Sequence, residues 1–455
     1  MLFTNKWLSV IFNNHKIIKE NNEIKKVFID SREEVEQGLF VPIVGERFDG
    51  HDFAIQAIKN GAVSLLWDKE KEVPEEIPND ISIFFVEDTT LALQELAKAY
   101  KNEIQAKVIG ITGSNGKTTT KDLVATVVSS TYRTHFTDGN FNNHIGLPLT
   151  ILDMPRDTEV LVLEMGMSAF GEIELLSKLA NPNISIITNI GESHIEFLGS
   201  KEGIKEAKLE IRSGMSGEGQ LIIDGDENLL FDLKDEENVI SCGFLSNNDV
   251  NIKEVKTDLE KTSFQLNGKE QYTVSLIGDH HAKNASFAIL VGRLLQIDEA
   301  VIVKSLQNLK LSGMRFEFLQ GKNGATIVND AYNASPTSMI GAIDTIRSLT
   351  SFKNKILVLG DIFELGSFGE QFHREIGDHV KRPITALITY GDLARYISSE
   401  VSDGEGVAVF HADSRDELLV HVEEYLNEDT IILFKASRGM EFEQLIEQVI
   451  DIPKL

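Results

Sequence analysis

A glycine-rich segment at residues 110–120 constrains the fold of this chain more than any other feature. It reads Gly-Ile-Thr-Gly-Ser-Asn-Gly-Lys-Thr-Thr-Thr, follows a short β-branched run and precedes residues 122–128, which predict a helix. A glycine-rich turn between a strand and a helix presents backbone N–H groups to an anion, and the helix dipole adds to that field. In this pattern Lys117 reaches the outer phosphates and the Thr118 hydroxyl faces a magnesium ion. We therefore expect the chain to bind a nucleoside triphosphate.

Length and charge narrow the remaining choices. A chain of 455 residues is too long for one core, so two to four domains are expected. The net charge of −27 argues against nucleic acid, whose binding needs clustered lysine and arginine. No apolar run approaches the roughly 18 residues that a membrane span needs, and the first residues lack a signal-peptide cleavage site. The single cysteine, Cys242, excludes an intramolecular disulfide and fits a reducing cytoplasm, where we expect this protein to act.

The pattern of apolar runs predicts three α/β domains with boundaries at 1–86, 87–311 and 312–455. The first is a small α/β domain with strands near 27–29, 39–41, 62–67 and 81–86 and a helix near 53–59. The second is a P-loop mononucleotide-binding domain with a mostly parallel sheet. Its helices are expected near 89–100, 201–213 and 285–295, and its strands near 159–163, 184–187 and 220–224. A strand-rich stretch follows at 238–278, and a linker at 306–315.

The third predicted domain alternates strands with helices. Strict alternation of this kind implies a parallel, doubly wound, Rossmann-like sheet. The expected strands lie near 326–328, 356–359, 386–389, 407–410 and 431–434, and the helices near 338–349, 370–381, 416–426 and 441–450.

Three polar side chains in the second domain are candidates for ligand chemistry. Glu164 directly follows a predicted buried strand, where an α/β sheet places its ligands, and is either a magnesium ligand or an ordinary strand-end acid. His194 lies just past the end of the next predicted strand, and its alternative is a satisfied core or surface histidine. Lys208 lies at the edge of an apolar helix face and needs a partner or a modification if it points inward. The pattern alone favours a stem that snorkels along apolar surface.

Two predicted loops carry further candidates. Arg32 and Arg47 lie in loops of the first domain and suit a diphosphate, because a guanidinium fork matches phosphate oxygens; the alternative is solvated surface arginine. Residues 139–149 are dense in amides and glycine, and this composition predicts irregular structure.

Together these pieces resemble the Mur ligase family, ATP-dependent amide ligases of peptidoglycan synthesis, over nearly the whole chain. Residues 112–118 look like that family's P-loop, which accounts for Ile111 in place of the usual glycine. The closest likeness is to members that add D-alanyl-D-alanine to UDP-N-acetylmuramoyl-tripeptide, through the segments 45–53, 139–149, 330–336, 359–366 and 435–438. The third domain lacks the Asp-Asn-Pro-Arg stretch of the members that add diaminopimelate.

The resemblance implies a reaction and its cofactors. A peptide carboxylate attacks the γ-phosphate of ATP, and the resulting acyl phosphate is attacked by the amine of the dipeptide, with release of ADP and phosphate. Two Mg²⁺ ions are implied, one held by Thr118 and Glu164 and the other by His194 and a carbamate of Lys208. The implied nucleotide-binding residues are Gly113, Ser114, Asn115, Gly116, Lys117, Thr118, Thr119, His280, Asn284, Arg315 and Asp330, and the implied catalytic residues are Lys117, His194, Lys208 and Arg315.

The resemblance also assigns the substrates to domains. The first domain is expected to bind the UDP-sugar precursor, and the third to bind the dipeptide and close over ATP. The implied substrate-binding residues are Ser31, Arg32, Arg47, Asn142 and Asn143 for the precursor and Asn333, Lys435, Ser437 and Arg438 on the dipeptide side. The chain departs from the family at Ala436, where glycine is usual, and at His281 and Ser335, where asparagine is usual. We expect a monomer.

Two other functions stay open from sequence. A sibling ligase would join a different amino acid, or extend folate with glutamate, and a folate ligase would not need the segment 45–53. A nucleotide-binding scaffold without ligase chemistry would tolerate loss of His194 and Lys208.

Overall fold

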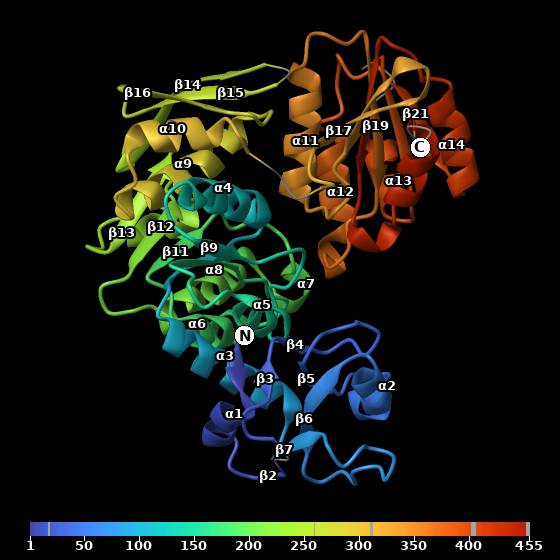
Figure 1. Cartoon of the computed structure of the whole chain (residues 1–455). Coiled ribbons are helices and arrows are strands. Elements are labelled where there is room, and N and C mark those ends of the chain that lie inside the picture. The colour runs from blue at the N-terminus through green and yellow to red at the C-terminus, as the bar shows by residue number, and fades with distance from the viewer. Residues whose placement is uncertain (17–18, 259, 310–312, 402–405, 452–455) are drawn as a thin grey trace.

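Three α/β units follow one another along the chain (Figure 1). The structure is a computed structural model that describes residues 1–16, 19–258, 260–309, 313–401 and 406–451. Each unit has a large sheet of its own, and the three-domain α/β architecture agrees with the prediction. The predicted boundary between the second and third domains, 311/312, lies outside the described residues.

The N-terminal unit contains a five-stranded sheet and a two-stranded one. The larger sheet has the order β2 (His15–Lys16), β7 (Ser82–Val86), β6 (Ala62–Asp68), β5 (Gly38–Phe40), β4 (Lys26–Phe28), and it is parallel except for the β2–β7 pair. The smaller sheet pairs β1 (Phe3–Thr4) with β3 (Glu23–Ile24). The α-helices of this unit are α1 (Asn5–Ile11) and α2 (Ala54–Lys59), and α3 (Thr89–Ile104) follows and leads into the central sheet.

The central sheet has nine strands, of which the first seven in chain order are parallel to one another. Its order is β16 (Glu270–Val274), β15 (Thr262–Leu266), β14 (Val250–Thr257), β13 (Val239–Gly243), β12 (Gln220–Asp224), β11 (Ile184–Ile187), β8 (Lys107–Thr112), β10 (Val160–Glu164), β9 (Thr134–Phe136). The pairs β14–β15 and β15–β16 are antiparallel and form a meander at one edge.

Successive residues of the central strands face opposite sides of the sheet, and both sets are apolar. Helices therefore cover both faces of the sheet. Ile109 and Ile111 of β8 pack with α4 (Lys117–Ser129) and α9 (Asp279–Leu294), while Val108 packs on the opposite side with α3. A strand buried on both faces is typical of a parallel sheet. The remaining helices are α5 (Gly146–Asp153), α6 (Glu172–Ala180), α7 (Ile195–Leu198), α8 (Lys201–Leu209) and α10 (Glu299–Leu306).

The C-terminal unit is the doubly wound sheet that the alternating pattern predicts. Its order is β17 (Glu317–Gln320), β18 (Thr326–Asn329), β22 (Thr430–Lys435), β19 (Asn354–Gly360), β20 (Ala386–Tyr390), β21 (Ala408–Ala412), and only β17 is antiparallel. Its helices are α11 (Pro336–Ser348), α12 (Gly369–Gly377), α13 (Ala394–Glu400), α14 (Arg415–Glu423) and α15 (Glu443–Val449). Within the described ranges, every helix is too short or too polar to cross a membrane.

Two local predictions were wrong, and some elements were not predicted. The helix after the glycine-rich segment starts at Lys117, earlier than its apolar stretch, because three threonines of its first turn are buried. Residues 139–149 are not wholly irregular: α5 starts at Gly146, where the Asn143 side chain accepts hydrogen bonds from Ile145 N and Gly146 N. The elements α10, α13 and β17 were not predicted, since each is short; of the predicted linker, 310–312 lie outside the described residues.

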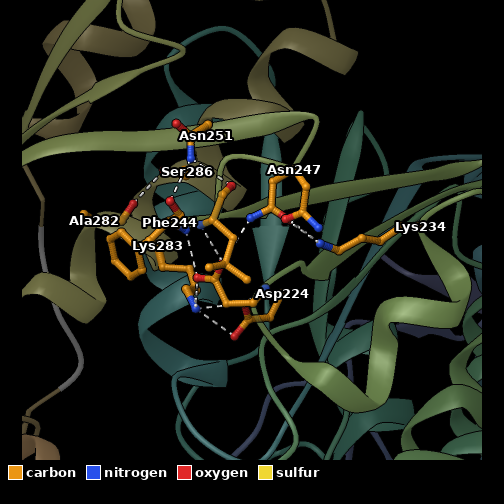
Figure 2. Close-up of polar contacts among 11 residues, drawn as sticks. Asp224, Lys234, Phe244, Asn247, Asn251, Ala282, Lys283 and Ser286 are labelled. Carbon is orange, nitrogen blue, oxygen red and sulfur yellow. Dashed lines mark hydrogen bonds and ion pairs between the residues drawn. The ribbon is translucent and has the colours of Figure 1, made fainter.

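A buried ionic network joins the ends of β12 and β13 to α9 (Figure 2). Lys283 Nζ lies 2.8 Å from Asp224 Oδ1 and 2.9 Å from Asp226 Oδ2. Burial raises the pKa of Asp224 in spite of Lys283, whereas backbone N–H groups and Lys283 lower the pKa of Asp226 against its burial. Cys242 lies beside this network at the end of β13, where burial raises the pKa of its thiol to about 12.

We predict that Lys283→Met destabilises the central sheet, because two largely buried carboxylates would lose their cation. The expected loss is about 3 kcal/mol, or roughly hundredfold faster amide exchange in β12 and α9. Hydrogen exchange read by mass spectrometry measures it locally, since both tryptophans, Trp7 and Trp67, lie in the N-terminal unit. Lys353→Met, which removes an exposed ion pair with Asp429, is the control and should leave amide exchange in β12 and α9 unchanged. Equal exchange in the two variants would contradict the prediction.

Candidate active site

The carboxyl ends of three neighbouring strands bring the candidate residues together. Strand β8 lies between β10 and β11, and Glu164 at the end of β10 is in register with Ile111 of β8. On the other side Ile187, the last residue of β11, is in register with Thr112. The glycine-rich loop, Glu164 and the segment after β11 therefore meet at one edge of the sheet, where α/β folds bind ligands.

The glycines of the loop are required by its backbone. Gly113 has φ 148°, and a Cβ there would lie 1.8 Å from Thr188 Oγ1. Gly116 has φ 78° and precedes the first turn of α4, where its left-handed conformation turns the chain into the helix. A Cβ on Gly116 would lie 3.0 Å from Asn284 Oδ1, so α9 approaches the loop closely.

The segment after β11 holds the glycine-rich loop in place. Asn189 Oδ1 accepts a hydrogen bond from Asn115 N at 2.9 Å, and Asn189 Nδ2 donates to Asn115 O at 3.0 Å. The Thr188 hydroxyl donates to the same carbonyl at 2.6 Å, and Gly191 N donates to Ser114 Oγ at 2.8 Å. Sequence reasoning missed Thr188 and Asn189 in this role. Their position directly after a buried strand was the available signal.

A cavity of 630 Å³ lies over this edge and extends to the third unit. The predicted residues that line it are Ser114, Asn115, Gly116, Lys117, Thr118, Thr119, Asn142, Asn143, Glu164, His194, His280, Asn284, Arg315, Asp330, Asn333 and Lys435. Sequence reasoning did not single out other lining residues, among them His144, Glu172, Tyr332 and Thr337. Gly113 and Lys208 do not line the cavity.

Lys117, Thr118 and Glu164 lie together in the wall of this cavity. Lys117 Nζ donates to Gly113 O at 2.8 Å, and Thr118 Oγ1 donates to Glu164 Oε2 at 2.8 Å. Asn142 Nδ2 donates to the other carboxylate oxygen at 2.9 Å, so this residue contacts the predicted metal ligand. Burial lowers the pKa of Lys117, an effect that Glu164 opposes and Arg315 reinforces.

Lys208 is fully buried rather than snorkelling toward solvent. Its exposed fraction is 1%, and among the described residues none forms a hydrogen bond or an ion pair with its side-chain amine. Burial lowers the pKa of Lys208 well below its ordinary value, and the nearby positive charge of Lys117 lowers it further. The alternative that the sequence pattern favoured for this residue was therefore wrong.

The third unit contacts the second around His194. His194 Nδ1 lies 2.5 Å from Glu364 Oε2, and Glu196 N donates to Glu364 O at 3.2 Å. Nearby, Ser335 Oγ donates to Asn115 Oδ1 at 2.8 Å and Thr337 Oγ1 donates to Glu192 Oε2 at 2.6 Å.

Basic and acidic residues of the third unit also face the cavity. The Arg315 guanidinium lies 4.2 Å from the centroid of the Tyr332 ring. Lys435 Nζ lies 2.5 Å from Asp330 Oδ2 and also donates to Asn333 O. Lys435 therefore lines the 630 Å³ cavity. Ser437 and Arg438, with which the sequence analysis grouped it, do not line this cavity.

The N-terminal end of α9 lines another part of the cavity. His280 and His281 lie with their ring centroids 4.0 Å apart, and Asn284 follows one turn later. Burial, followed by the effect of His280, lowers the pKa of His281 well below its ordinary value.

A second pocket of 490 Å³ adjoins the first and is lined by Ser437 and Arg438. It also includes residues 332–335 and 362–365 of the third unit and residues 139–140 and 193–194 of the second. His194 and residues 332–334 line both pockets, so these residues form their common border.

The N-terminal candidates lie outside both pockets. Arg32 is exposed and pairs with Asp30 at 2.6 Å, and this partner lowers the pKa of Asp30 to about 2. Arg47 is exposed, and Ser31 O accepts a hydrogen bond from Asn60 Nδ2 at 2.8 Å.

Family models match three successive parts of the chain. The Mur ligase family catalytic domain matches residues 23–101, the Mur ligase middle domain 111–292 and the Mur ligase glutamate ligase domain 314–438.

Curated relatives and solved structures carry related names. A UDP-N-acetylmuramoyl-tripeptide--D-alanyl-D-alanine ligase of Bacillus subtilis is 46% identical, with 95% of each chain covered. A crystal structure of MurF from Acinetobacter baumannii is 29% identical, with 98% of each chain covered and a TM-score of 0.87. A MurF ligase structure from Thermotoga maritima in complex with ADP is 29% identical, covers 93% of this chain and 96% of the other, and has a TM-score of 0.79. The chain therefore belongs to the Mur ligase family and is a ligase.

Proposed function

We propose that this ligase joins D-alanyl-D-alanine to UDP-N-acetylmuramoyl-tripeptide through an acyl phosphate, with release of ADP and phosphate from ATP, in the synthesis of peptidoglycan precursors. The observation that carries the proposal is the pair of adjoining pockets, one of which contains a glycine-rich phosphate loop. A reaction that activates a carboxylate in one pocket and delivers an amine from the other needs this adjacency. The 46% identical relative, which bears the name of this activity, supports the same conclusion.

Phosphoryl transfer depends on positioning and neutralisation of charge more than on covalent help. Lys117 and the N–H groups of the loop, Gly113 to Thr119, hold the β- and γ-phosphates. Arg315, which comes from the third unit and stacks on Tyr332, neutralises charge on the transferred group. Asn284 and His280 on α9 would face the base of the nucleotide and Asp330 would lie on its third-domain side, since all three line the cavity.

The donor set at Glu164 suits Mg²⁺. The described residues contain no group of three or more histidine, cysteine or carboxylate side chains that could hold a metal by themselves. Mg²⁺ is usually held by one or two carboxylates together with substrate phosphates and water. Thr118 and Glu164 would hold one such ion beside the phosphates, and His194 a second; the ions supply charge neutralisation on the transferred phosphoryl group.

The surroundings of Lys208 favour its conversion to a carbamate. A lowered pKa makes a buried amine neutral more often than an exposed lysine, and a neutral amine attacks CO₂: the C–N bond forms as one C=O π bond opens to an oxyanion, and the proton from nitrogen passes to water. The product is an anion, which Lys117 would stabilise instead of opposing. As a carbamate, Lys208 would join His194 in holding the second ion.

The two peptide substrates occupy opposite sides of the nucleotide. Ser31, Arg32 and Arg47 of the N-terminal unit would bind the UDP-sugar end of the precursor. Asn142 and Asn143 would bind the same substrate near the phosphates. Asn333, Ser437 and Arg438 would bind the dipeptide, with Lys435 acting through its contact with Asn333.

The first prediction from the proposed function concerns phosphate release. Release should require ATP, the UDP-linked tripeptide and D-alanyl-D-alanine together, and Lys117→Ala should lower kcat at least about a hundredfold, because a main neutralising charge is lost. Lys107→Ala, at the exposed start of the same strand, is the matched control and should keep full activity. Release that ignores the dipeptide would refute the proposed reaction.

The second prediction concerns the carbamate. With ¹³C-bicarbonate present, the protein should show a carbamate carbon resonance that disappears in Lys208→Arg. Lys101→Arg is the control: Lys101 is also buried, with its pKa lowered to about 8, but it donates to Ala180 O. Persistence of the resonance in Lys208→Arg would exclude this residue as its source.

The third prediction concerns closure of the third unit over ATP. An ATP analogue with precursor should reduce the radius of gyration measured by small-angle X-ray scattering, because an acyl phosphate must be kept from water. Thr337→Val, which removes the contact with Glu192, should leave the free protein more extended on average. An unchanged radius in the native protein on binding would count against closure.

A further inference from the structure

The second pocket carries one carboxylate and one guanidinium. Glu364 and Arg438 are both among its lining residues, with side chains 45% and 55% exposed. The other described lining residues are neutral or apolar apart from His194. A pocket with one acidic and one basic side chain complements a zwitterion, whose ammonium and carboxylate groups have the opposite arrangement.

The two charged residues have different neighbours. Both line the second pocket and not the first, but Glu364 contacts His194, which lies on the border between the two pockets, whereas Arg438 pairs with Glu443 at 3.0 Å. The amine of the incoming substrate is the nucleophile, so it must face the activated carboxylate at that border. The acidic side chain therefore lies where the reacting group of a zwitterionic substrate has to be.

We propose that Glu364 binds the ammonium group of the incoming dipeptide and sets it at the border with the nucleotide cavity, while Arg438 binds the dipeptide carboxylate. This inference rests on the proposed function and extends it to a residue outside the predicted site. It makes Glu364 a substrate-binding residue of the second half-reaction alone.

The contacts of Glu364 leave one carboxylate oxygen available. Oε2 lies 2.5 Å from His194 Nδ1, and among the described residues no side-chain or backbone donor forms a hydrogen bond with Oε1. A glutamate carboxylate is ordinarily an anion at neutral pH. An anionic oxygen at the pocket wall is a suitable partner for an ammonium group.

The backbone around Glu364 is fixed from several sides. Glu364 has φ 61°, a left-handed conformation that costs a non-glycine residue energy and persists only where neighbours impose it. Phe363 N donates to Ser437 Oγ at 2.9 Å, which ties this loop to the segment that carries Arg438. Behind the loop, His373 Nε2 accepts from Ile362 N at 3.1 Å, while its Nδ1 contacts Gly369 O. Both charged side chains thus belong to one connected wall.

The test compares Glu364→Gln with Glu370→Gln, an exposed acidic residue of the same unit that pairs with Arg374. Loss of a charge-assisted hydrogen bond should raise the KM for D-alanyl-D-alanine at least about tenfold in Glu364→Gln, with the KM values for ATP and precursor unchanged. Formation of the acyl phosphate without dipeptide, trapped as a hydroxamate with hydroxylamine, should continue in this variant. Glu370→Gln should match the native protein throughout.

A substrate analogue separates the two ends of the dipeptide. Arg438→Met should raise the KM for D-alanyl-D-alanine but not for D-alanyl-D-alaninamide, which has no carboxylate. Glu364→Gln should raise the KM for both, because both keep the amine.

Two results would overturn the inference. One is an unchanged dipeptide KM together with slower acyl phosphate formation in Glu364→Gln, which would mean that Glu364 only orients His194. The other is a Glu364→Gln effect that vanishes with the amide analogue. Failure of the proposed function looks different, because the native protein itself would then release no phosphate in response to the dipeptide.

Discussion

Two lysines near one another determine what this site can hold. Lys117 is partly buried at the cavity, and its charge is close enough to lower the pKa of the fully buried Lys208. Like charges repel strongly where the dielectric is low, so such a pair is unfavourable unless anions accompany it. Glu164 supplies one negative charge beside Thr118. A polyphosphate supplies more, which explains why the surrounding elements converge on the glycine-rich loop.

The sheet provides the geometry that this electrostatic arrangement needs. Strand β8 lies between β10 and β11, so the ends of these three strands lie side by side. The glycine-rich loop, Glu164 and the Thr188–Asn189 segment, which forms hydrogen bonds with the loop, therefore meet. The third unit adds Arg315, Glu364 and Lys435 from a different sheet. The chemistry is therefore distributed over two units, and the relative placement of the units controls it.

Features that depend on local pattern could be predicted from the sequence. The alternating strands and helices of the third unit follow from apolar periodicity, and the glycine-rich loop follows from its position between a strand and a helix. Glu164 was found because it ends a buried strand. The Lys208 pattern suggested the wrong orientation, since helical periodicity places a residue near a face but does not tell whether a neighbouring element covers it.

Contacts between distant segments could not be predicted in this way. Glu364 meets His194 across 170 residues of chain, a distance in sequence that no local pattern spans. The pairing of Lys435 with Asp330 depends likewise on the adjacency of β18 and β22, which follows from the order of strands in the folded sheet. Residues that act through such contacts become visible only when the topology is known.

The seclusion of Cys242 has a practical consequence for following motion in this molecule. The chain has one thiol, and its enclosure beside Lys283 and Ser286 keeps it protonated and out of reach of alkylating dyes. A single cysteine engineered on the surface of each of two units would therefore react with a maleimide fluorophore pair against a silent background. Resonance energy transfer between them could report the separation of the units, molecule by molecule, in the natural framework.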